Sequence, residues 1–365
     1  MAGKMRAARL YEPGAPFRVD EIDVPEPRPG DVVVRVRACG IVPNMRHIVS
    51  GKFWHTLPRM PAIFGLDSAG EVAKLGAHVH GFAEGDRVYV NPALACGGCA
   101  YCRKGLPAFC DIGALQGYFG FRPGSLALLD KYPYGGFSEY QTAAAANLVK
   151  LPDTVTFDQG ARFGYLGTVY GALKAGGARA GGSLAILGGT GTLGVHAVLF
   201  ALGLGMTRIV PLARNRERLD RLKALAPARI APIVIDGSPL AERVRAATGG
   251  MGVDLLLDCL ARGTQADMTA DALMGLRRGG CAVNIGALSE PVAVNPTWLM
   301  TNAMQYRGSN WFTVAEAEEM AELFRAGIVN LSPLETRPFP LDGVNEALAE
   351  AGRNHGGFVN IVVRP

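Results

Sequence analysis

Four closely spaced cysteines are the residues of this chain that point most directly to metal chemistry. Cys96, Cys99 and Cys102 follow one another at intervals of three, and Cys110 comes eight residues later in the same run, CGGCAYCRKGLPAFC. Four thiolates this close form a tetrahedral cage with no coordination position left for a substrate. The spacing therefore predicts one structural Zn²⁺ ion. The alternative is a pair of disulfides, which leaves three thiols in apolar, strand-like runs unpaired: Cys39, Cys259 and Cys281.

A glycine-rich turn predicts the site of a dinucleotide. In SLAILGGTGTLG, Gly189, Gly191 and Gly194 form a GxGxxG pattern between a strand-like and a helix-like run. Glycines permit the tight turn and let backbone N–H groups approach a pyrophosphate, while the helix N-terminus adds partial positive charge. A purely structural glycine turn is the alternative. We expect cofactor contacts from the whole turn: Gly189, Thr190, Gly191, Thr192, Leu193 and Gly194.

The end of the next strand-like run, RIVPL, favours NADP(H) over NAD(H). An NAD site carries a carboxylate there for the ribose 2′-hydroxyl, whereas this chain continues Ala213-Arg214-Asn215-Arg216. A carboxylate would repel a 2′-phosphate, but Arg214 can pair with it through two parallel hydrogen bonds. We include Arg218 of the same arginine cluster in the predicted site. The alternative is that these arginines are the solvated start of a helix.

Composition and charge exclude several classes of protein. Of the 365 residues, 49% are hydrophobic and 48 are glycine, which is typical of a folded chain of two domains and not of a disordered one. The net charge of +5 forms no basic stripe, so we expect no nucleic-acid partner. No export signal is visible, and the longest apolar run, residues 195–206, is too short to span a bilayer. We therefore expect a cytoplasmic protein with no membrane partner.

The elements that must position these residues change character along the chain. Residues 5–40 are predicted to form short strands split by PEPRPG, and further strand-like runs follow at 70–75 and 87–90, in a β-rich region with Pro and Gly between strands that extends to about residue 150. From Gly182 onward, strand-like and helix-like runs alternate, which indicates βαβ units on a parallel sheet. The predicted fold class is therefore α/β, with a β-rich domain and a doubly wound parallel sheet. One predicted helix begins at Thr192. Three others are predicted over residues 217–226, 265–276 and 314–326.

Two further features are interpreted as packing. The aromatic-rich stretch 117–140 is predicted to be a long loop, either a lid or, as we favour, a packed surface segment. His196 lies on the apolar helix that follows the glycine turn, where a buried core histidine is favoured over a catalyst.

The whole chain resembles the medium-chain dehydrogenase/reductase superfamily, in particular the zinc-containing alcohol dehydrogenases. The resemblance rests on PEPRPGDVVVRVRACGI, GLDSAGEV, GDRV, the four-cysteine lobe, YGGFSEY, GGTGTLG, IGAL and YRGS. It implies a GroES-like catalytic domain from residues 1–160 and 312–365, and a Rossmann domain from residues 161–311. The structural zinc lobe would cover about residues 92–112. The resemblance also implies a cleft between the domains, and a homodimer or homotetramer made by joining Rossmann sheets.

The family's catalytic zinc site does not carry over to this sequence. The first ligand, a cysteine in a CGICxxD-type run, is replaced by Val42. The histidine of a Gly-His-Glu run is replaced by Leu66, and the third ligand, a cysteine, by Gly164. These side chains cannot ligate zinc, so we expect no catalytic Zn²⁺; a displaced ion on Cys39 and Asp67 is the alternative. The GLDSAG run resembles the zinc-free quinone and enoyl reductases of the superfamily.

The resemblance implies other residues for the chemistry. Asn44 stands where the family has a Ser or Thr beside the substrate oxygen, so its amide is the first candidate donor. His47 matches the family's proton-relay histidine, with a surface or ribose-contacting role as the alternative. Asp67 is expected to orient a donor or a water, or to form a structural ion pair with a nearby arginine such as Arg46. Further cofactor contacts are implied for Thr168, Gly286, Ala287 and Leu288. Aromatic residues that the substrate entrance could use are Phe53, Trp54, His55, Trp298 and Trp311.

These predictions together describe an NADP(H)-dependent oxidoreductase that transfers hydride without a catalytic zinc. The acceptor is expected to be a small, fairly apolar carbonyl compound or a conjugated enone. We favour the alcohol dehydrogenase-like reaction and keep enoyl or quinone reduction as the alternative. A non-catalytic NADPH-binding protein, or a lyase or isomerase on the same fold, is the alternative of a different class.

Overall fold

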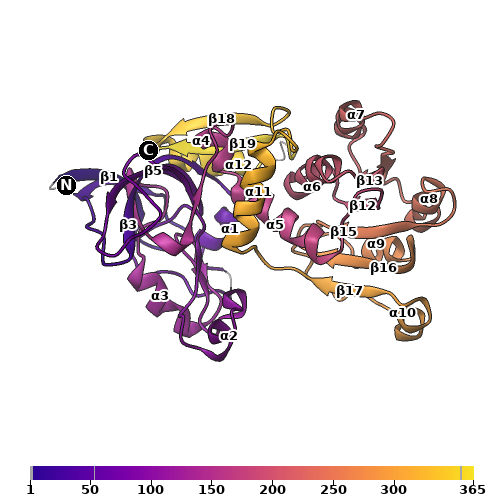
Figure 1. Ribbon diagram of the computed structural model, residues 1–365, viewed down its shortest axis with the longest axis horizontal. Helices are drawn as coiled ribbons and strands as arrows, with labels where there is room; N and C mark the ends of the chain where they lie inside the picture. Colours follow the sequence, from indigo (N-terminus) through magenta and orange to yellow (C-terminus); the bar gives the residue numbers. More distant parts are fainter. Residues whose placement is uncertain (1–2, 53, 354–355) are drawn as a thin grey trace.

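The computed structural model describes residues 3–52, 54–353 and 356–365, and the chain folds into two lobes (Figure 1). The first lobe is built around a sheet in which β10 (Tyr140–Ala144) pairs with β3. The run DVVVRVRACG that forms β3 is buried along almost its whole length, because the sheet is covered on both faces. The order of the other strands is β11 (Leu148–Lys150), β6 (Arg87–Val90), β5 (Asp67–Leu75), β3 (Asp31–Gly40), β19 (Val359–Arg364) and β18 (Glu335–Pro340).

Two three-stranded sheets complete this lobe. One is β2 (Arg18–Asp23), β1 (Lys4–Leu10) and β4 (Ala62–Ile63), and the other is β7 (Ala93–Leu94), β8 (Ala114–Leu115) and β9 (Phe119–Gly120). The helices before the parallel sheet are α1 (Met45–Val49), α2 (Ala100–Arg103), α3 (Leu126–Lys131), α4 (Phe157–Gly160) and α5 (Phe163–Ala175). Those after it are α11 (Val314–Arg325) and α12 (Val344–Ala351).

The second lobe is a six-stranded, all-parallel sheet. Its order is β14 (Ile233–Val234), β13 (Arg208–Ala213), β12 (Ser183–Leu187), β15 (Val253–Asp258), β16 (Leu276–Asn284) and β17 (Gln305–Gly308). The chain starts in the middle of this sheet and builds outward in both directions. The order therefore reverses between β12 and β15, which is where doubly wound sheets bind their ligands. The helices of this lobe are α6 (Thr192–Gly203), α7 (Arg216–Leu225), α8 (Leu240–Ala246), α9 (Ala266–Leu273) and α10 (Pro296–Asn302).

The α/β fold class predicted from the sequence is confirmed. The C-terminal strand β19 pairs with β3, so the end of the chain returns to the first lobe, as the ribbon colours show (Figure 1). This return agrees with a catalytic domain assembled from both chain ends, while the exact boundaries at residues 160 and 312 stay a prediction. None of the described helices is long and apolar enough to cross a lipid bilayer.

Sequence-based boundaries are wrong in one helix. The helix predicted over residues 265–276 ends at Leu273, and Leu276 already pairs with Val253 as the first residue of β16. The helix ends in a turn in which the backbone N–H groups of Met274 and Gly275 donate to the carbonyls of Asp271 and Ala272 at 3.0 and 2.9 Å. Two short elements, β14 and α8, were not predicted from the sequence, whereas β17 corresponds to the YRGS run.

The aromatic-rich stretch 117–140 is not one irregular loop. It contains β9 and α3, and four of its aromatic side chains are almost fully buried. The packing interpretation is therefore confirmed for these residues: Tyr118, Phe119, Tyr132 and Phe137.

Candidate active site and metal cluster

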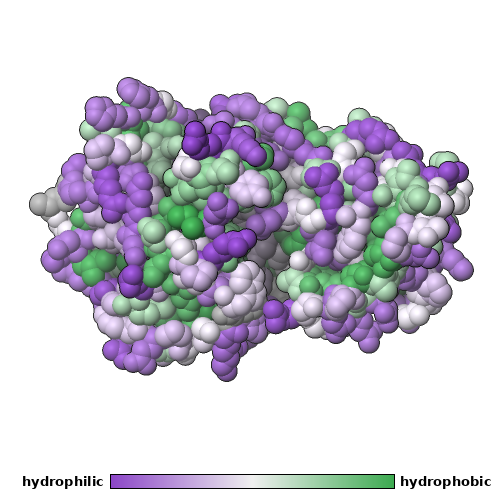
Figure 2. Space-filling view, turned by 90° about the horizontal axis from the view of Figure 1, so that it is seen from below, coloured by the Kyte–Doolittle hydropathy of each residue, from purple (hydrophilic) through white to green (hydrophobic). Residues whose placement is uncertain are grey.

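A cleft of about 460 Å³ lies between the two lobes, and residues of both line it. The space-filling view shows the surface hollowed where the lobes meet (Figure 2). One wall is the turn that joins β12 to α6, with Thr190, Gly191 and Thr192. The facing wall comes from the first lobe and includes Ile41 and Pro43 of the segment after β3.

The turn can adopt this path only because its glycines have no side chain. A Cβ on Gly194 would lie 2.4 Å from the carbonyl oxygen of Gly188, and one on Gly189 would lie 2.6 Å from Pro211. Gly188 itself has a φ of +74°, a backbone conformation that favours glycine. The turn therefore brings backbone N–H groups and the start of α6 to the cleft, as a pyrophosphate site requires.

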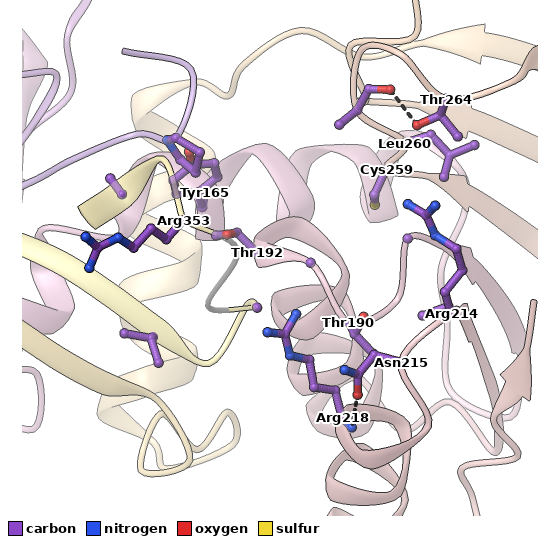
Figure 3. Close-up of a pocket in the computed structure, with 18 of the residues that line it drawn as sticks. Tyr165, Thr190, Thr192, Arg214, Asn215, Arg218, Cys259, Leu260, Thr264 and Arg353 are labelled. Atoms are coloured by element: carbon purple, nitrogen blue, oxygen red, sulfur yellow. Dashed lines mark hydrogen bonds between the residues drawn. The ribbon is translucent and has the colours of Figure 1, made fainter. Parts of the chain in front are cut away.

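Three arginines line the cleft: Arg214, Arg218 and Arg353 (Figure 3). Arg214 and Arg218 come from the loop after β13 and the first turn of α7, whose start is capped by Asn215 accepting a hydrogen bond from the Arg218 backbone N–H at 2.8 Å. Arg214 makes no hydrogen bond or ion pair within the described part of the chain. No Asp or Glu is among the described residues that line the cleft. Arg353 is paired with Glu350 at 2.6 Å, so Arg214 is the guanidinium best placed to receive an anionic ligand in the cleft.

The remaining predicted cofactor residues lie at or behind this cleft. Gly189, Leu193 and Gly194 support the turn, and Leu193 packs against the core of the sheet. The backbone N–H groups of Gly286 and Ala287 donate to the carbonyls of Asp258 and Leu260, and Leu260 lines the cleft. Leu288 and Thr168 are half-buried and do not line the cleft, and the Thr168 hydroxyl donates to the Gly164 carbonyl within its own helix.

The four lobe cysteines converge. Their sulfur atoms all lie within 4.8 Å of one another, and in the described part of the chain they are the one such group of three or more potential ligands. Backbone N–H groups of Cys99 and Cys96 donate to the sulfurs of Cys96 and Cys110 at 3.3 and 3.2 Å. Backbone hydrogen bonds from Cys102 and Asp111 lower the pKa of Cys99 to about 6. All seven cysteines are unpaired thiols, so the two-disulfide alternative is not what the chain adopts.

The former catalytic-zinc positions are occupied differently. Val42 and Leu66 are buried, and a Cβ on Gly164 would lie 2.1 Å from Oδ1 of Asp67. The Asp67 carboxylate therefore fills the space in which the side chain of a third ligand would stand. With Val, Leu and Gly at the ligand positions and one carboxylate beside them, the donor set does not fit a zinc ion.

Asp67 is almost fully enclosed at the start of β5. Its Oδ1 accepts a hydrogen bond from the Tyr89 hydroxyl at 2.8 Å. Burial raises the pKa of Asp67 to about 7, and hydrogen bonding by Tyr89 and the Gly164 backbone offsets part of that rise. Among the described residues Asp67 forms no ion pair with Arg46 or another arginine, so the ion-pair alternative for Asp67 is wrong. Burial and the neighbouring Asp67 also raise the pKa of the Cys39 thiol.

Asn44 and His47 lie at the start of α1, and both are exposed. The Tyr118 hydroxyl donates to Asn44 Oδ1 at 2.6 Å. This bond occupies the amide oxygen and leaves the amide nitrogen as a donor. Neither Asn44 nor His47 lines the cleft directly, although Pro43 next to Asn44 does.

Three residues of this region were not predicted from the sequence to belong to the site. Tyr165 follows Gly164 on α5 and lines the cleft, and Tyr118 contacts Asn44. Arg162 is 1% exposed, and its Nη1 lies 3.4 Å from both His196 Nε2 and the Gly357 carbonyl oxygen. The signal for Tyr165 was its place directly after a lost ligand position. No sequence pattern marked Arg162.

His196 is a buried core histidine, as predicted. Burial and the charge of Arg162 lower its pKa well below the usual value, so the ring is neutral. Because a guanidinium can only donate, Nε2 is the acceptor and Nδ1 carries the proton. Burial lowers the pKa of Arg162 to about 9.

The five aromatic residues considered for a substrate entrance do not form one group. Phe53 lies outside the described residues. Trp54 is 71% exposed and stacks on His55, while Trp298 packs against the core of the parallel sheet. Trp311 lines a second cavity, of about 880 Å³, between the cysteine lobe and residues 310–314, and its Nε1 donates to Asn91 Oδ1 at 2.9 Å.

Comparison with known proteins defines the class. The family model "Alcohol dehydrogenase GroES-like domain" matches residues 28–153, and "Zinc-binding dehydrogenase" matches residues 192–326. An alcohol dehydrogenase of Geobacillus stearothermophilus is 30% identical over 340 residues, which cover 91% of this chain and 93% of that protein. An NDMA-dependent alcohol dehydrogenase of Amycolatopsis methanolica is 28% identical over 378 residues, 98% of each chain.

Solved structures agree with this assignment. A protein described as a zinc-binding dehydrogenase, from Sinorhizobium meliloti 1021 and bound to NADP, superposes with a TM-score of 0.84 and 25% identity over the full length of both chains. The chain therefore belongs to the medium-chain dehydrogenase/reductase superfamily as an alcohol dehydrogenase-like member. It is an oxidoreductase of that family.

Proposed function

We propose that this oxidoreductase uses NADP(H) to reduce a small, apolar carbonyl compound, with one structural zinc and no catalytic zinc. The observation that carries the proposal is the charge of the dinucleotide cleft, which three arginines line and no described carboxylate does. The cofactor, when bound, supplies the hydride and both electrons.

The preference for NADP(H) rests on the loop after β13. The strand ends at Ala213, and Arg214 follows where an NAD site would carry an acid. Arg214 has no ion-pair partner within the described chain, so its guanidinium is available to a 2′-phosphate. The NADP bound to the Sinorhizobium protein supports the same reading. NAD(H) is the weaker alternative.

We assign the structural zinc to the four thiolates of the cysteine lobe. Their mutual distances and the backbone N–H groups that donate to their sulfurs suit a closed tetrahedral site. The absence of a catalytic zinc is inferred from the donor set at Val42, Leu66 and Gly164, which offers no side-chain ligand.

Without a Lewis acid, fixed hydrogen-bond donors must stabilise the charge that develops on the substrate oxygen. Each preorganised donor contributes about 3–4 kcal/mol in a water-excluded site. We assign this role to the amide nitrogen of Asn44, because Tyr118 holds the amide oxygen. Asn44 is exposed in the structure, so the bound substrate and cofactor must exclude water from it. His47 is exposed on the helix that Asn44 begins, at the position that matches the family's proton-relay histidine.

A conjugated alkene is the alternative acceptor. Addition of hydride to its β-carbon places charge on an enolate oxygen, which needs an acid and no metal, so the Asn44 and Asp67 surroundings also suit an enoyl or quinone reductase. A protein that binds NADPH without turnover, or a lyase or isomerase, is the alternative of another class.

We also infer a homodimer or homotetramer. In the described chain β17 pairs with β16 on one side only, so its other edge is available to a second parallel sheet.

Stopped-flow mixing tests the reaction. The protein with bound NADPH is mixed with a panel of ketones, aldehydes and enones, and loss of the reduced nicotinamide absorbance is followed. We expect oxidation with ketones or aldehydes. Oxidation by enones alone would favour the alkene alternative, and NADPH that binds tightly but is oxidised by no acceptor would contradict the proposal.

A further inference from the structure

Three tyrosines lie within the electrostatic reach of the buried Asp67 carboxylate, and they differ in what their hydroxyls contact. Tyr89 donates to Asp67 and Tyr118 donates to Asn44. The hydroxyl of Tyr165 has no hydrogen-bond partner among the residues that the structure describes. Of the three hydroxyl protons, that of Tyr165 is therefore the one that is not donated to another described residue.

The position of Tyr165 suits a group that reacts. It follows Gly164, the position of the family's third zinc ligand, and it lines the interlobe cleft with Ile41 and Pro43. Figure 3 shows its side chain on the same side of the cleft as the start of α6 at Thr192. Tyr89 and Tyr118 are almost fully buried and do not line this cleft.

A buried positive charge lies close to Tyr165. Arg162, one turn earlier on the chain, has two guanidinium nitrogens, Nε and Nη2, that find no partner within the described residues. Burial and the neighbouring Asp67 raise the pKa of the Tyr165 hydroxyl, so it is protonated in the resting protein. The charge of Arg162 acts in the opposite direction, because it stabilises a tyrosinate. The neutral ring of His196 lies 6.3 Å from the Tyr165 ring and adds no charge.

We propose that Tyr165 is the general acid that protonates the oxygen of the substrate, with Arg162 as the positioning charge behind it. This inference rests on the proposed function. As hydride adds to the carbonyl carbon, the π pair of the C=O bond moves to oxygen. The Tyr165 O–H bond then breaks, its proton bonds to that oxygen, and the tyrosinate left behind regains a proton from water in the cleft. With an enone, the same proton goes to the enolate oxygen.

The test compares two conservative variants on one helix. Tyr165→Phe removes the proposed acid, and Tyr170→Phe removes a hydroxyl that donates to Glu319 away from the cleft. We expect Tyr165→Phe to slow single-turnover hydride transfer about 100-fold or more, since general acids contribute 10²–10⁴-fold. The dissociation constant for NADPH should change less than about twofold, and Tyr170→Phe should match the wild type in both.

A second measurement does not depend on turnover. Acetophenone is held with NADP⁺, which cannot reduce it, and the infrared band of its carbonyl is recorded. A hydrogen bond from Tyr165 should shift this band to lower wavenumber in the wild type, and Tyr165→Phe should abolish the shift. Tyr165→His keeps a hydrogen-bond donor at this position. If Tyr165→Phe is poorly folded, the hydride-transfer rate of Tyr165→His should still lie above that of Tyr165→Phe.

The outcomes separate two failures. A wild type that reduces no acceptor contradicts the proposed function. An active wild type whose rate and carbonyl band are unchanged in Tyr165→Phe assigns the protonation to another group and overturns the role of Tyr165 alone.

Discussion

The cysteine lobe and the Asp67 site are two places where this family can hold zinc, and in this chain they have opposite character. The lobe keeps four sulfurs within 4.8 Å, partly exposed and bound by backbone N–H groups. At the other site, the ligand positions are apolar and Asp67, 1% exposed, fills the space beside Gly164. The difference shows that the side chains suited to hold a loop-shaping metal and those suited to hold a catalytic metal can be present or absent independently in one chain.

The largest effect is expected in the lobe. Cys102→Ser removes one ligand, so the cage should lose its ion, because a closed site needs all four thiolates. We expect about one zinc per subunit in the wild type and close to none in the variant, with a lower melting temperature. Atomic emission measures the zinc content and calorimetry the melting temperature. The control is Cys281→Ser, which lies outside the cage and should keep its zinc. Two zinc ions per subunit in the wild type would contradict the inference that the Asp67 site holds no zinc.

Asp67 should make stability depend on pH. Its folded-state pKa is raised to about 7, while in the unfolded chain it ionises near the usual 3.8. Between these values the folded state keeps a proton that the unfolded state has lost, so the free energy of unfolding falls as pH rises from about 4 to 7. The fall is on the order of 4 kcal/mol, and Asp67→Asn should remove it. Urea unfolding at pH 5 and pH 8 should show about two-thirds of this fall in the wild type and none of it in Asp67→Asn. An equal change in the free energy of unfolding in both proteins would contradict the raised pKa.

Gly164→Cys tests whether the second site can be rebuilt. The new Cβ would start 2.1 Å from Asp67 Oδ1, so the variant should lose about 1–3 kcal/mol of stability through overpacking. It should also bind no additional zinc. Gly171→Cys on the same helix is the matched control, because its Cβ would meet Glu316 at an ordinary 3.5 Å. A second zinc bound by Gly164→Cys would show that the site is one ligand away from function.

The smallest effect concerns the cofactor. Arg214→Ala should weaken NADPH about 10- to 100-fold and leave NADH within about twofold, because a hydrogen bond to a charged group contributes about 1.5–3 kcal/mol. Arg216→Ala, in the same cluster but outside the cleft lining, should leave both unchanged. Fluorescence titration of the apoprotein measures the constants. Equal losses for the two cofactors would count against a contact with the 2′-phosphate.

Local patterns carried much of the prediction. The cysteine spacing, the GxGxxG turn and the alternation of strands and helices after Gly182 each depend on a few neighbouring residues, and the structure contains the cluster, the turn and the parallel sheet. Short elements such as β14 and α8 were missed because so few residues cannot show a clear hydrophobic period. β14 is placed by its pairing with β13, and α8 by its packing against α9.

The sequence by itself determined the fold class, the four converging thiols and the loss of the zinc ligands, because side-chain chemistry and short-range spacing decide these. Only the tertiary structure showed that Asp67 fills the space beside Gly164 and that Arg162 contacts His196. It also showed that Tyr165 lines the cleft and that its hydroxyl has no hydrogen-bond partner among the described residues. These relations join residues from β5, from the start of α5 and from α6. Their energies depend on burial, which no local pattern records.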